Sequence, residues 1–355
     1  MTAAGWDSSA FRDRVQEALD SFLDEQAARL APLGPDAARL IAEARTTVRG
    51  GKRFRAAFCW WGHLALAPAA DEEALVRACA ALELLHASAL VHDDLMDASD
   101  TRRGRPATHR QLESEHRTSG WTGDPEQYGA AAAILLGDML LSWADELLRR
   151  CGLPLTQVAP ALEVFDLCRS EVVAGQFLDV SVQARGRADV DTAMTVLRYK
   201  SAKYSIERPL HIGAALAGAD RSALDALSAF GLPLGEAFQL RDDLLGVFGD
   251  PATTGKPAGD DLVEGKRTVL VALALDAAPP AQAALLDRSL GGPLDEAAVA
   301  RLREVIDSSG ARAQVEAVIE QLADLALAAL DRASVDVAAR DALRGLAEAA
   351  TQRDV

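Results

Sequence analysis

The stretch ACAALELLHASALVHDDLMD, from Ala78 to Asp97, decides the fold class. Its first part, ACAALELLHASALV, is apolar or small on nearly every side, which is typical of a helix buried in a protein core. Its last part is acidic, and Asp93 and Asp97 share one helix face because they are four residues apart. Two carboxylates on one face repel each other unless a cation lies between them. The stretch therefore predicts a helical protein with a polar site where this helix ends.

The rest of the chain also favours a helical fold. The chain has 355 residues, is 5% aromatic and contains 14 prolines, a composition that suits an all-α protein with a large core. Helical periodicity dominates, and neither a strand-hairpin pattern nor a dinucleotide-binding glycine motif appears. We predict helices over residues 8–31, 36–48, 52–67, 71–97, 129–150, 156–185, 189–201, 203–218, 221–247, 265–276, 295–308, 311–332 and 335–352.

The domain organisation is expected to be simple. The stretches most typical of loops are 118–127 and 249–265, and neither is long enough to act as a linker between domains. We therefore predict a single domain over residues 1–355.

Charge and cysteine usage narrow the class of protein. The net charge of −16 argues against a general nucleic-acid binder but permits a small anionic substrate bound by local cations. The four cysteines form no CxxC pair, which predicts reduced, buried thiols and a cytoplasmic location. No signal-peptide pattern is visible, and the apolar runs are interrupted by charge, so we expect no transmembrane segment.

The carboxylates at Asp93 and Asp97 suit Mg²⁺, a hard ion that takes oxygen ligands and bridges to phosphates. The alternative is a solvated acidic helix end, which DDxxD patterns in acidic chains often are. His86 lies seven residues before Asp93, nearly on the same stripe. It is either a hydrogen-bonded core residue or a polar contact to a substrate, and both readings stay open.

A second acidic pair, Asp242 and Asp243, stands in FQLRDDLLGVFGD at the end of another apolar helical run. The position four residues after Asp242 is Gly246 rather than an acid, which makes this pair weaker as a metal site by itself. Asp260 and Asp261 follow in a loop-like stretch, as does Asp250, and we interpret these three as solvated acids.

A cationic segment accompanies each acidic one. RGGKRFR, from Arg49 to Arg55, places cations at a helix N-terminus, where the dipole favours a bound anion. TRRGRP follows the first acidic pair, YKSAKYSIERP carries Lys200 and Ser201, and GKPAGDDLVEGKRT follows the second pair. Each segment alone could be a solvated basic turn. Together they fit diphosphates held between Mg²⁺ on one side and Lys or Arg on the other.

These segments, in this order, resemble the trans-prenyltransferases, the head-to-tail isoprenyl diphosphate synthases. The resemblance runs from GGKRFR through ELLHASALVHDDLMDASDTRRGRPA, GQFLD, KSAKY and FQLRDDLLGVFGD to GKPAGDDLVEGKRT, and so covers nearly the whole chain. It implies the all-α isoprenoid synthase fold, a single-domain bundle of roughly a dozen helices around a central cavity. It also implies a homodimer.

The resemblance further implies a role for each matching residue. The Mg²⁺ ligands would be Asp93, Asp97 and Asp242, with support from Asp94, Asp179 and Asp243. The allylic diphosphate, whether dimethylallyl, geranyl or farnesyl, would face Arg102, Lys200, Ser201, Gln239, Lys256 and Lys266. Isopentenyl diphosphate would be held by Lys52, Arg55, His86 and Arg103. The residues that carry the chemistry would be Asp93, Asp97, Lys200, Asp242 and Lys256.

Product length follows from the residues just before Asp93. Bulky aromatics at the fourth and fifth positions before that aspartate generally stop chain growth early in the family, whereas Ser88 and Ala89 are small. We therefore expect geranylgeranyl diphosphate, with farnesyl or longer diphosphates as alternatives.

Three other functions compete with the synthase. A non-catalytic modulatory subunit is suggested only by Gly246. A metal phosphohydrolase is suggested by the pair His92–Asp93, but it needs further histidine ligands. A terpene cyclase also uses DDxxD, but no convincing N-D-x-x-S-x-x-x-E pattern is present.

Overall fold

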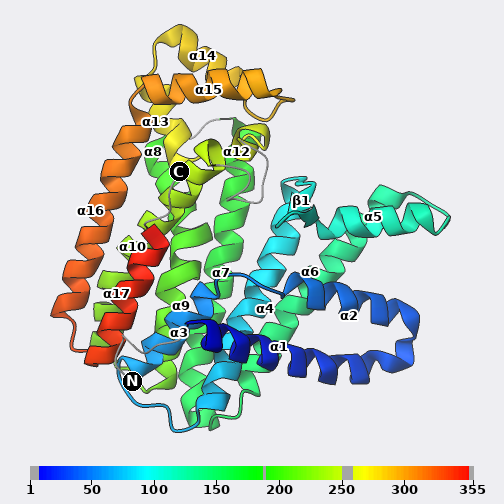
Figure 1. Cartoon of the computed structure of the whole chain (residues 1–355), viewed down its shortest axis with the longest axis vertical. Coiled ribbons are helices and arrows are strands. Elements are labelled where there is room, and N and C mark those ends of the chain that lie inside the picture. Colours follow the sequence, from blue (N-terminus) through cyan, green and yellow to red (C-terminus); the bar gives the residue numbers. More distant parts are fainter. Residues whose placement is uncertain (1–7, 187–188, 250–258, 352–355) are drawn as a thin grey trace. The chain divides into compact units, whose positions relative to one another are not determined.

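The computed structural model describes residues 8–186, 189–249 and 259–351, which are almost entirely helical (Figure 1). This confirms the all-α fold class. The chain divides into two compact units. The first comprises the described residues of Met1–Glu163 with Ile212–Ala219 and Asp336–Ala339, and the second comprises Val164–His211, Asp220–Val335 and the described residues of Arg340–Val355. The single domain over residues 1–355 stays a prediction.

The first unit is built on long helices. Its elements are α1 (Ser8–Leu30), η2 (Ala31–Leu33), α2 (Pro35–Thr47), α3 (Phe54–Leu64), α4 (Glu72–Met96), the strands β1 (Thr101–Arg102) and β2 (Arg105–Pro106), α5 (Thr108–Thr118), α6 (Pro125–Arg149) and the start of α7 (Leu155–Arg185). Helix α4 packs against α6, α3 and α1, which bury it.

The second unit packs around α10. Its elements are the rest of α7, α8 (Val190–Val196), the π-helical segment η3 (Leu197–Glu207), α9 (Arg208–Leu216), α10 (Arg221–Phe248), α12 (Asp260–Val263), α13 (Val269–Ala277), α14 (Pro280–Ser289), α15 (Glu296–Ser308), α16 (Ala311–Arg332) and α17 (Val337–Thr351). Helices α7, α9 and α17 contribute residues to both units. Helix α10 packs against α16 and η3 over an aliphatic core.

Helix α4 is defined at both ends by its own sequence. Asp71 caps its start by accepting a hydrogen bond from the backbone nitrogen of Ala74 at 2.9 Å, and acidic residues fill the first turn, where the helix dipole favours them. After Met96 the chain turns away through Ala98, whose φ is 54°. Among the described residues, α4 is the one helix long and apolar enough to span a membrane, but 78% of its most apolar window is buried, as in a core helix.

Three local features differ from the predicted helices. Helix α5 was not predicted, because its sequence is strongly polar and only one stripe, including Thr108, Leu112 and His116, is buried. Helix α14 was not predicted either, and Pro280 occupies its first helical position, where proline is favoured. The predicted break between 201 and 203 is absent, since η3 runs through it without interruption.

A short β-hairpin connects α4 to α5. Strands β1 and β2 pair antiparallel, and the turn residues Arg103 and Gly104 have φ values of 52° and 72°. Two successive residues with positive φ are typical of a tight hairpin turn. Each strand has only two residues, which is too short to show an alternating pattern in the sequence.

Candidate active site

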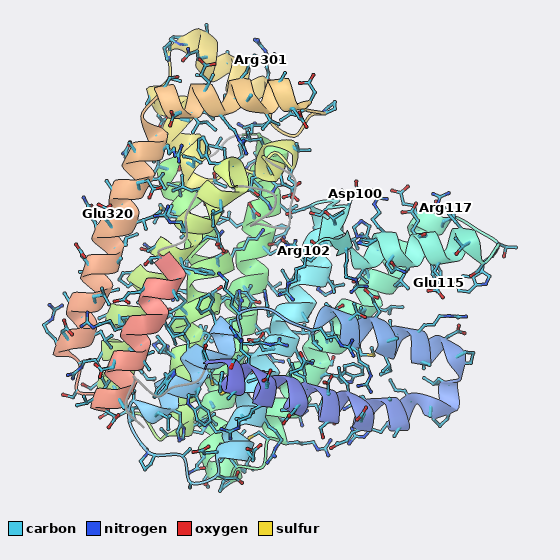
Figure 2. All side chains as sticks on the ribbon, viewed as in Figure 1. Asp100, Arg102, Glu115, Arg117, Arg301 and Glu320 are labelled. Atoms are coloured by element: carbon cyan, nitrogen blue, oxygen red, sulfur yellow. The ribbon has the colours of Figure 1, made fainter. Side chains whose placement is uncertain are left out.

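The first acidic motif occupies the last turn of α4. The backbone nitrogen of Asp97 donates to the carbonyl oxygen of Asp93 at 2.8 Å, so the helical geometry that places these two carboxylates on one face is kept. Asp94 is buried and accepts a hydrogen bond from Nε of Arg102 at 2.8 Å. The same guanidinium lies 3.9 Å from Oδ2 of Asp93. Arg102, labelled in Figure 2, therefore joins the hairpin to the acidic end of α4.

Arginines gather around His86 on the same helix. Burial holds the pKa of His86 well below its ordinary value, and the positive charges of Arg55, Arg103, Arg102 and Arg53 lower it further. The ring is therefore neutral at physiological pH, as a hydrogen-bonding partner rather than an additional cation. The structure thus brings together His86 and three of the predicted diphosphate-binding arginines from separate sequence segments. Such a concentration of positive charge suits a polyanionic ligand.

The segment GGKRFR contains both structural and candidate binding residues. Arg53 is buried, donates to Glu83 at 3.0 Å and to the carbonyl oxygen of Val48 at 2.5 Å, and so fixes the entry to α3. Lys52 is exposed directly before it, and Arg55 lies in the first turn of α3. Of the three cations, Lys52 and Arg55 are therefore placed where an anion can approach a helix N-terminus.

The second acidic pair lies near the end of α10. Asp242 is half-buried, whereas Asp243 is buried and accepts a hydrogen bond from Nε2 of Gln239 at 2.8 Å. Burial raises the pKa of Asp243 to about 8, and the charges of Asp261 and Asp242 raise it as well. A cation bound among these carboxylates would relieve their repulsion, so the donor set fits a hard metal ion.

Asp261 occupies the space that a side chain at position 246 would need. A Cβ built on Gly246 would lie 2.0 Å from Oδ2 of Asp261. Asp261 is only 9% exposed, and its Oδ1 lies 3.5 Å from Nζ of Lys266. Our interpretation of Asp261 as a solvated acid is therefore wrong. Sequence reasoning missed this contact because it is visible only once α10 and α12 are folded together.

The predicted residues of η3 and α7 also meet within the second unit. Nζ of Lys200 donates to Oδ2 of Asp179 at 2.6 Å, and Asp179 is buried. Ser201 is half-buried next to Lys200 in the same π-helical segment. Lys256 and Asp250 lie outside the described residues.

The carboxylates fit Mg²⁺ as partial ligand sets rather than as complete cages. Within the described parts of the chain, no three His, Cys, Asp or Glu side chains form a metal-binding group by themselves. Mg²⁺ usually takes one or two protein carboxylates and completes its octahedron with waters and substrate phosphates. Asp93 with Asp97, and Asp242 beside Asp243, supply donors of that kind. Their roles as metal ligands stay a prediction.

Ser88 and Ala89 differ in their surroundings. Ser88 is buried, and its hydroxyl donates to the carbonyl oxygen of Gly137 on α6 at 2.7 Å. Ala89 is half-buried. Of the two predicted chain-length residues, Ser88 therefore packs between α4 and α6, and Ala89 is the better candidate for contact with a substrate tail.

The position of His92 argues against the phosphohydrolase alternative, which required His92 and Asp93 to act as a pair. Nε2 of His92 lies 3.3 Å from the carbonyl oxygen of Ile134 and 3.5 Å from Oδ1 of Asp138. The ring thus packs onto α6, and the described residues offer no set of further ligands around it.

Placing an aspartate at position 246, four residues after Asp242, should harm the protein. Gly246→Asp would force a side chain into the space of Asp261 and add a like charge, so we expect a loss of about 1–3 kcal/mol in stability. It should not enlarge the rise in Tm that Mg²⁺ produces. Gly345→Asp, at a helical position with nothing within 4 Å of a new Cβ, is the control. A Gly246→Asp variant that is more stable and binds Mg²⁺ more tightly would contradict this account.

Comparison with known proteins identifies the family. The family model described as polyprenyl synthetase matches residues 38–308. A crystal structure of geranylgeranyl pyrophosphate synthase from Corynebacterium glutamicum, complexed with isoprenyl diphosphate and magnesium, superposes with a TM-score of 0.96 at 42% identity and covers 98% of this chain and 100% of that one.

Two curated relatives from Mycobacterium tuberculosis differ in product. A (2E,6E)-farnesyl diphosphate synthase is 34% identical over 69% of this chain and 64% of its own length. A geranylgeranyl diphosphate synthase is 37% identical over 65% of this chain and 61% of its own length. The match thus spans less than two thirds of the length of either relative. Because the family model matches most of the chain, and the fold and the sequence motifs agree with it, the chain belongs to the polyprenyl synthetase family.

Proposed function

We propose that the protein is a trans-prenyltransferase that condenses an allylic diphosphate with isopentenyl diphosphate to a longer all-trans prenyl diphosphate. The observation that carries the proposal is the meeting of Asp93, Asp94, Arg102 and the arginines around His86 at the end of α4. One end of a buried helix thus presents carboxylates for a metal ion and cations for an anion. Both are needed to bind a diphosphate.

Two sets of residues are proposed to bind the two substrates. Arg102, Lys200, Ser201 and Gln239 are proposed to hold the allylic diphosphate, together with Lys256 and Lys266. Their positive charge stabilises the leaving diphosphate as the allylic C–O bond breaks and a carbocation forms. Lys52, Arg55, His86 and Arg103 are proposed to hold isopentenyl diphosphate. Its double bond attacks the carbocation, and the proton lost afterwards passes to the released diphosphate.

Magnesium is the proposed cofactor. Asp93, Asp97 and Asp242 would bind it, with Asp94, Asp179 and Asp243 in support, and it would neutralise charge on the diphosphate oxygens. Support comes from the Corynebacterium structure named above, which was solved with magnesium, and from a Caulobacter crescentus polyprenyl synthase, complexed with calcium and isoprenyl diphosphate, at 30% identity and a TM-score of 0.76.

The proposed product is geranylgeranyl diphosphate. The small residue Ala89 supports it, as does the geranylgeranyl synthase from Corynebacterium glutamicum. Farnesyl diphosphate is the second candidate, because a farnesyl synthase is also among the relatives. We further propose a cytoplasmic location, supported by four cysteines that are all buried and form no disulfide with one another.

A homodimer is the proposed assembly. Helix α7 exposes an apolar row of Val173, Phe177 and Val180, and the Phe177 side chain is 73% exposed. These residues recur at helical spacing and form one surface stripe. An exposed stripe of this kind on a rigid helix is typical of a surface that a second subunit covers.

The first prediction tests the synthase itself. Wild-type protein with Mg²⁺ should release diphosphate only when both an allylic diphosphate and isopentenyl diphosphate are present. Asp93→Ala removes one of the paired carboxylates and should lower this rate by several orders of magnitude while the helical circular dichroism is unchanged. Asp100→Ala, at an exposed residue that pairs with Arg110, is the control and should have little effect.

Two outcomes would contradict the proposal. Release of phosphate or diphosphate without isopentenyl diphosphate would indicate a hydrolase or a cyclase. No release with any allylic primer would favour the modulatory subunit.

The second prediction concerns product length. Ala89→Phe should shorten the main product while activity is retained, since a ring at this half-buried position would meet the growing tail. Ser88→Phe should instead cost about 1–3 kcal/mol of stability, because it replaces a buried hydroxyl packed against Gly137. Mass analysis of dephosphorylated products and thermal unfolding measure the two effects. An unchanged product distribution in an active Ala89→Phe enzyme would show that the tail does not pass this residue.

The third prediction concerns assembly. Phe177→Lys should shift the protein from dimer to monomer in sedimentation velocity, because it places a charge in the middle of the apolar row. Leu33→Lys, at another exposed apolar residue outside α7, is the matched control and should stay dimeric. If Phe177→Lys sediments as the wild-type dimer does, the row is not the interface.

A further inference from the structure

One face of α7 holds Lys200 by both side chain and backbone. Glu171, Gly175 and Asp179 are spaced by four residues and so lie on one face of this helix. Asp179 accepts a hydrogen bond from Nζ of Lys200 at 2.6 Å. A Cβ on Gly175 would lie 2.4 Å from the backbone nitrogen of Lys200, so α7 and η3 touch there backbone to backbone. Only glycine permits this approach.

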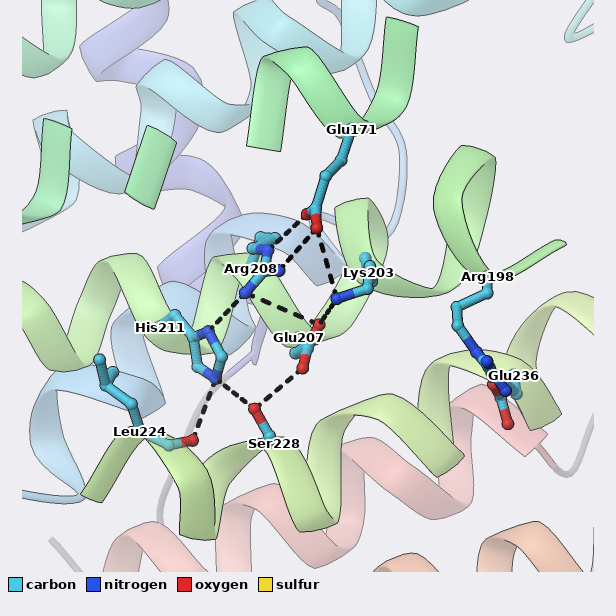
Figure 3. A network of polar contacts seen from close by, with 9 residues as sticks. All are labelled: Glu171, Arg198, Lys203, Glu207, Arg208, His211, Leu224, Ser228 and Glu236. Atoms are coloured by element: carbon cyan, nitrogen blue, oxygen red, sulfur yellow. Dashed lines mark hydrogen bonds and ion pairs between the residues drawn. The ribbon is translucent and has the colours of Figure 1, made fainter. Parts of the chain in front are cut away.

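Glu171, one turn before Gly175, anchors the far end of η3. Its carboxylate accepts hydrogen bonds from Nε and Nη2 of Arg208 at 2.6 Å and 2.8 Å (Figure 3). Nζ of Lys203 lies 3.4 Å from Glu171 and 3.1 Å from Glu207. Two carboxylates thus face two cations, and Glu207 is only 4% exposed. A balanced, paired set of this kind can be buried, whereas a single member left unpaired is strongly unfavourable.

A neutral histidine completes the cluster. Because a guanidinium only donates, Nδ1 of His211 accepts a hydrogen bond from Nη1 of Arg208 at 3.1 Å. Nε2 therefore carries the proton and lies 3.1 Å from the carbonyl oxygen of Leu224. It also lies 3.0 Å from the hydroxyl of Ser228, which donates to Glu207 at 2.9 Å. Burial, which lowers the pKa of His211 to about 4, agrees with the neutral ring.

The segment between these anchors is π-helical. Its hydrogen bonds span five residues instead of four, a rare geometry that is frequently found at functional sites. If one wide turn relaxed into an α-turn, Lys200 would rotate relative to the residues after it. At one end of the segment, Arg208 is held by Glu171 and Glu207 pairs with Lys203. At the other end, Lys200 is held by Asp179. These two anchors keep the wide turns in register.

We propose that the η3 cluster, which we define as Glu171, Lys203, Glu207, Arg208 and His211, positions Lys200 for the allylic diphosphate. Glu171 acts as a positioning residue, because it joins both cations of the cluster to the helix face that also binds Lys200. This proposal rests on the proposed synthase function and on Lys200 as an allylic ligand.

A double-mutant cycle tests the proposal. Glu171→Gln keeps the shape of the side chain and removes its charge. In wild-type background it should lower kcat/KM for the allylic substrate about tenfold or more, while KM for isopentenyl diphosphate changes less than about twofold. In Lys200→Ala background the same change should cost less than about twofold, because the residue being positioned is already absent.

Stability alone predicts a different pattern. Leu286→Ala removes a fully buried side chain on α14 and serves as the destabilised control, with a lower Tm but unchanged kinetic constants per folded enzyme. Equal effects of Glu171→Gln in both backgrounds, or equal effects on both substrates, would overturn the proposal. Should Glu171→Gln fail to fold, Arg208→Lys carries the same test, since it keeps the charge and loses the paired contact with Glu171.

A measurement that does not depend on catalysis can test the positioning role separately from the synthase activity. Hydrogen exchange of the backbone amides in Leu197–Glu207 should become faster in Glu171→Gln, but not in Leu286→Ala. Unchanged exchange in this segment would overturn the positioning role even in an active enzyme. A wild-type protein without condensation activity would instead refute the synthase, and the exchange result would still decide whether the cluster fixes η3.

Discussion

Like charges at the end of a buried helix impose the central constraint on this protein. Asp93 and Asp97 share a face in the last turn of α4, most of which is surrounded by apolar packing. Carboxylates so placed destabilise the fold unless positive charge compensates them. Arg102 supplies part of that charge from the hairpin. The remainder can come from a metal ion, and this links the stability of the helix end to ligand binding.

Repulsion between nearby carboxylates also constrains the second unit, where the groups are buried. Asp243 and Asp261 are both buried, and burial together with the charge of Asp261 raises the pKa of Asp243. The absence of a side chain at Gly246 gives Asp261 its place. Packing against Asp261 therefore explains why position 246 carries no acidic side chain. Gly246 therefore gives no separate reason to expect a non-catalytic subunit.

How far the sequence could predict each feature depends on whether its cause is local. Helix α4 is predictable because it is apolar on nearly all sides and ends in acids, and its observed bounds, Glu72–Met96, agree with the expected 71–97. Helix α5 escaped prediction because its buried stripe is narrow and mostly polar. The family motifs identified the candidate residues, because together the motifs pair carboxylates that can bind a metal ion with cations that can bind a diphosphate.

Contacts between distant segments could not be derived in the same way. The contact of Asp261 with position 246 needs α12 to fold back on α10. The hydrogen bond of Ser88 to α6 decides which of two small residues can meet a substrate, and sequence spacing treats both alike. The side chains that we propose to fix η3 come partly from α7 and α9, so no property of the segment KSAKY alone predicts its π-helical geometry.

The central claim is that the carboxylates bind diphosphate through a divalent cation. Isothermal titration calorimetry of inorganic pyrophosphate into the wild-type protein, with Mg²⁺ or with excess chelator, tests this claim most directly. We expect saturable binding with Mg²⁺ and a large loss of affinity with chelator, since the acidic groups then repel the ligand. Equal affinity under both conditions would contradict it, because the arginines and lysines alone would then suffice.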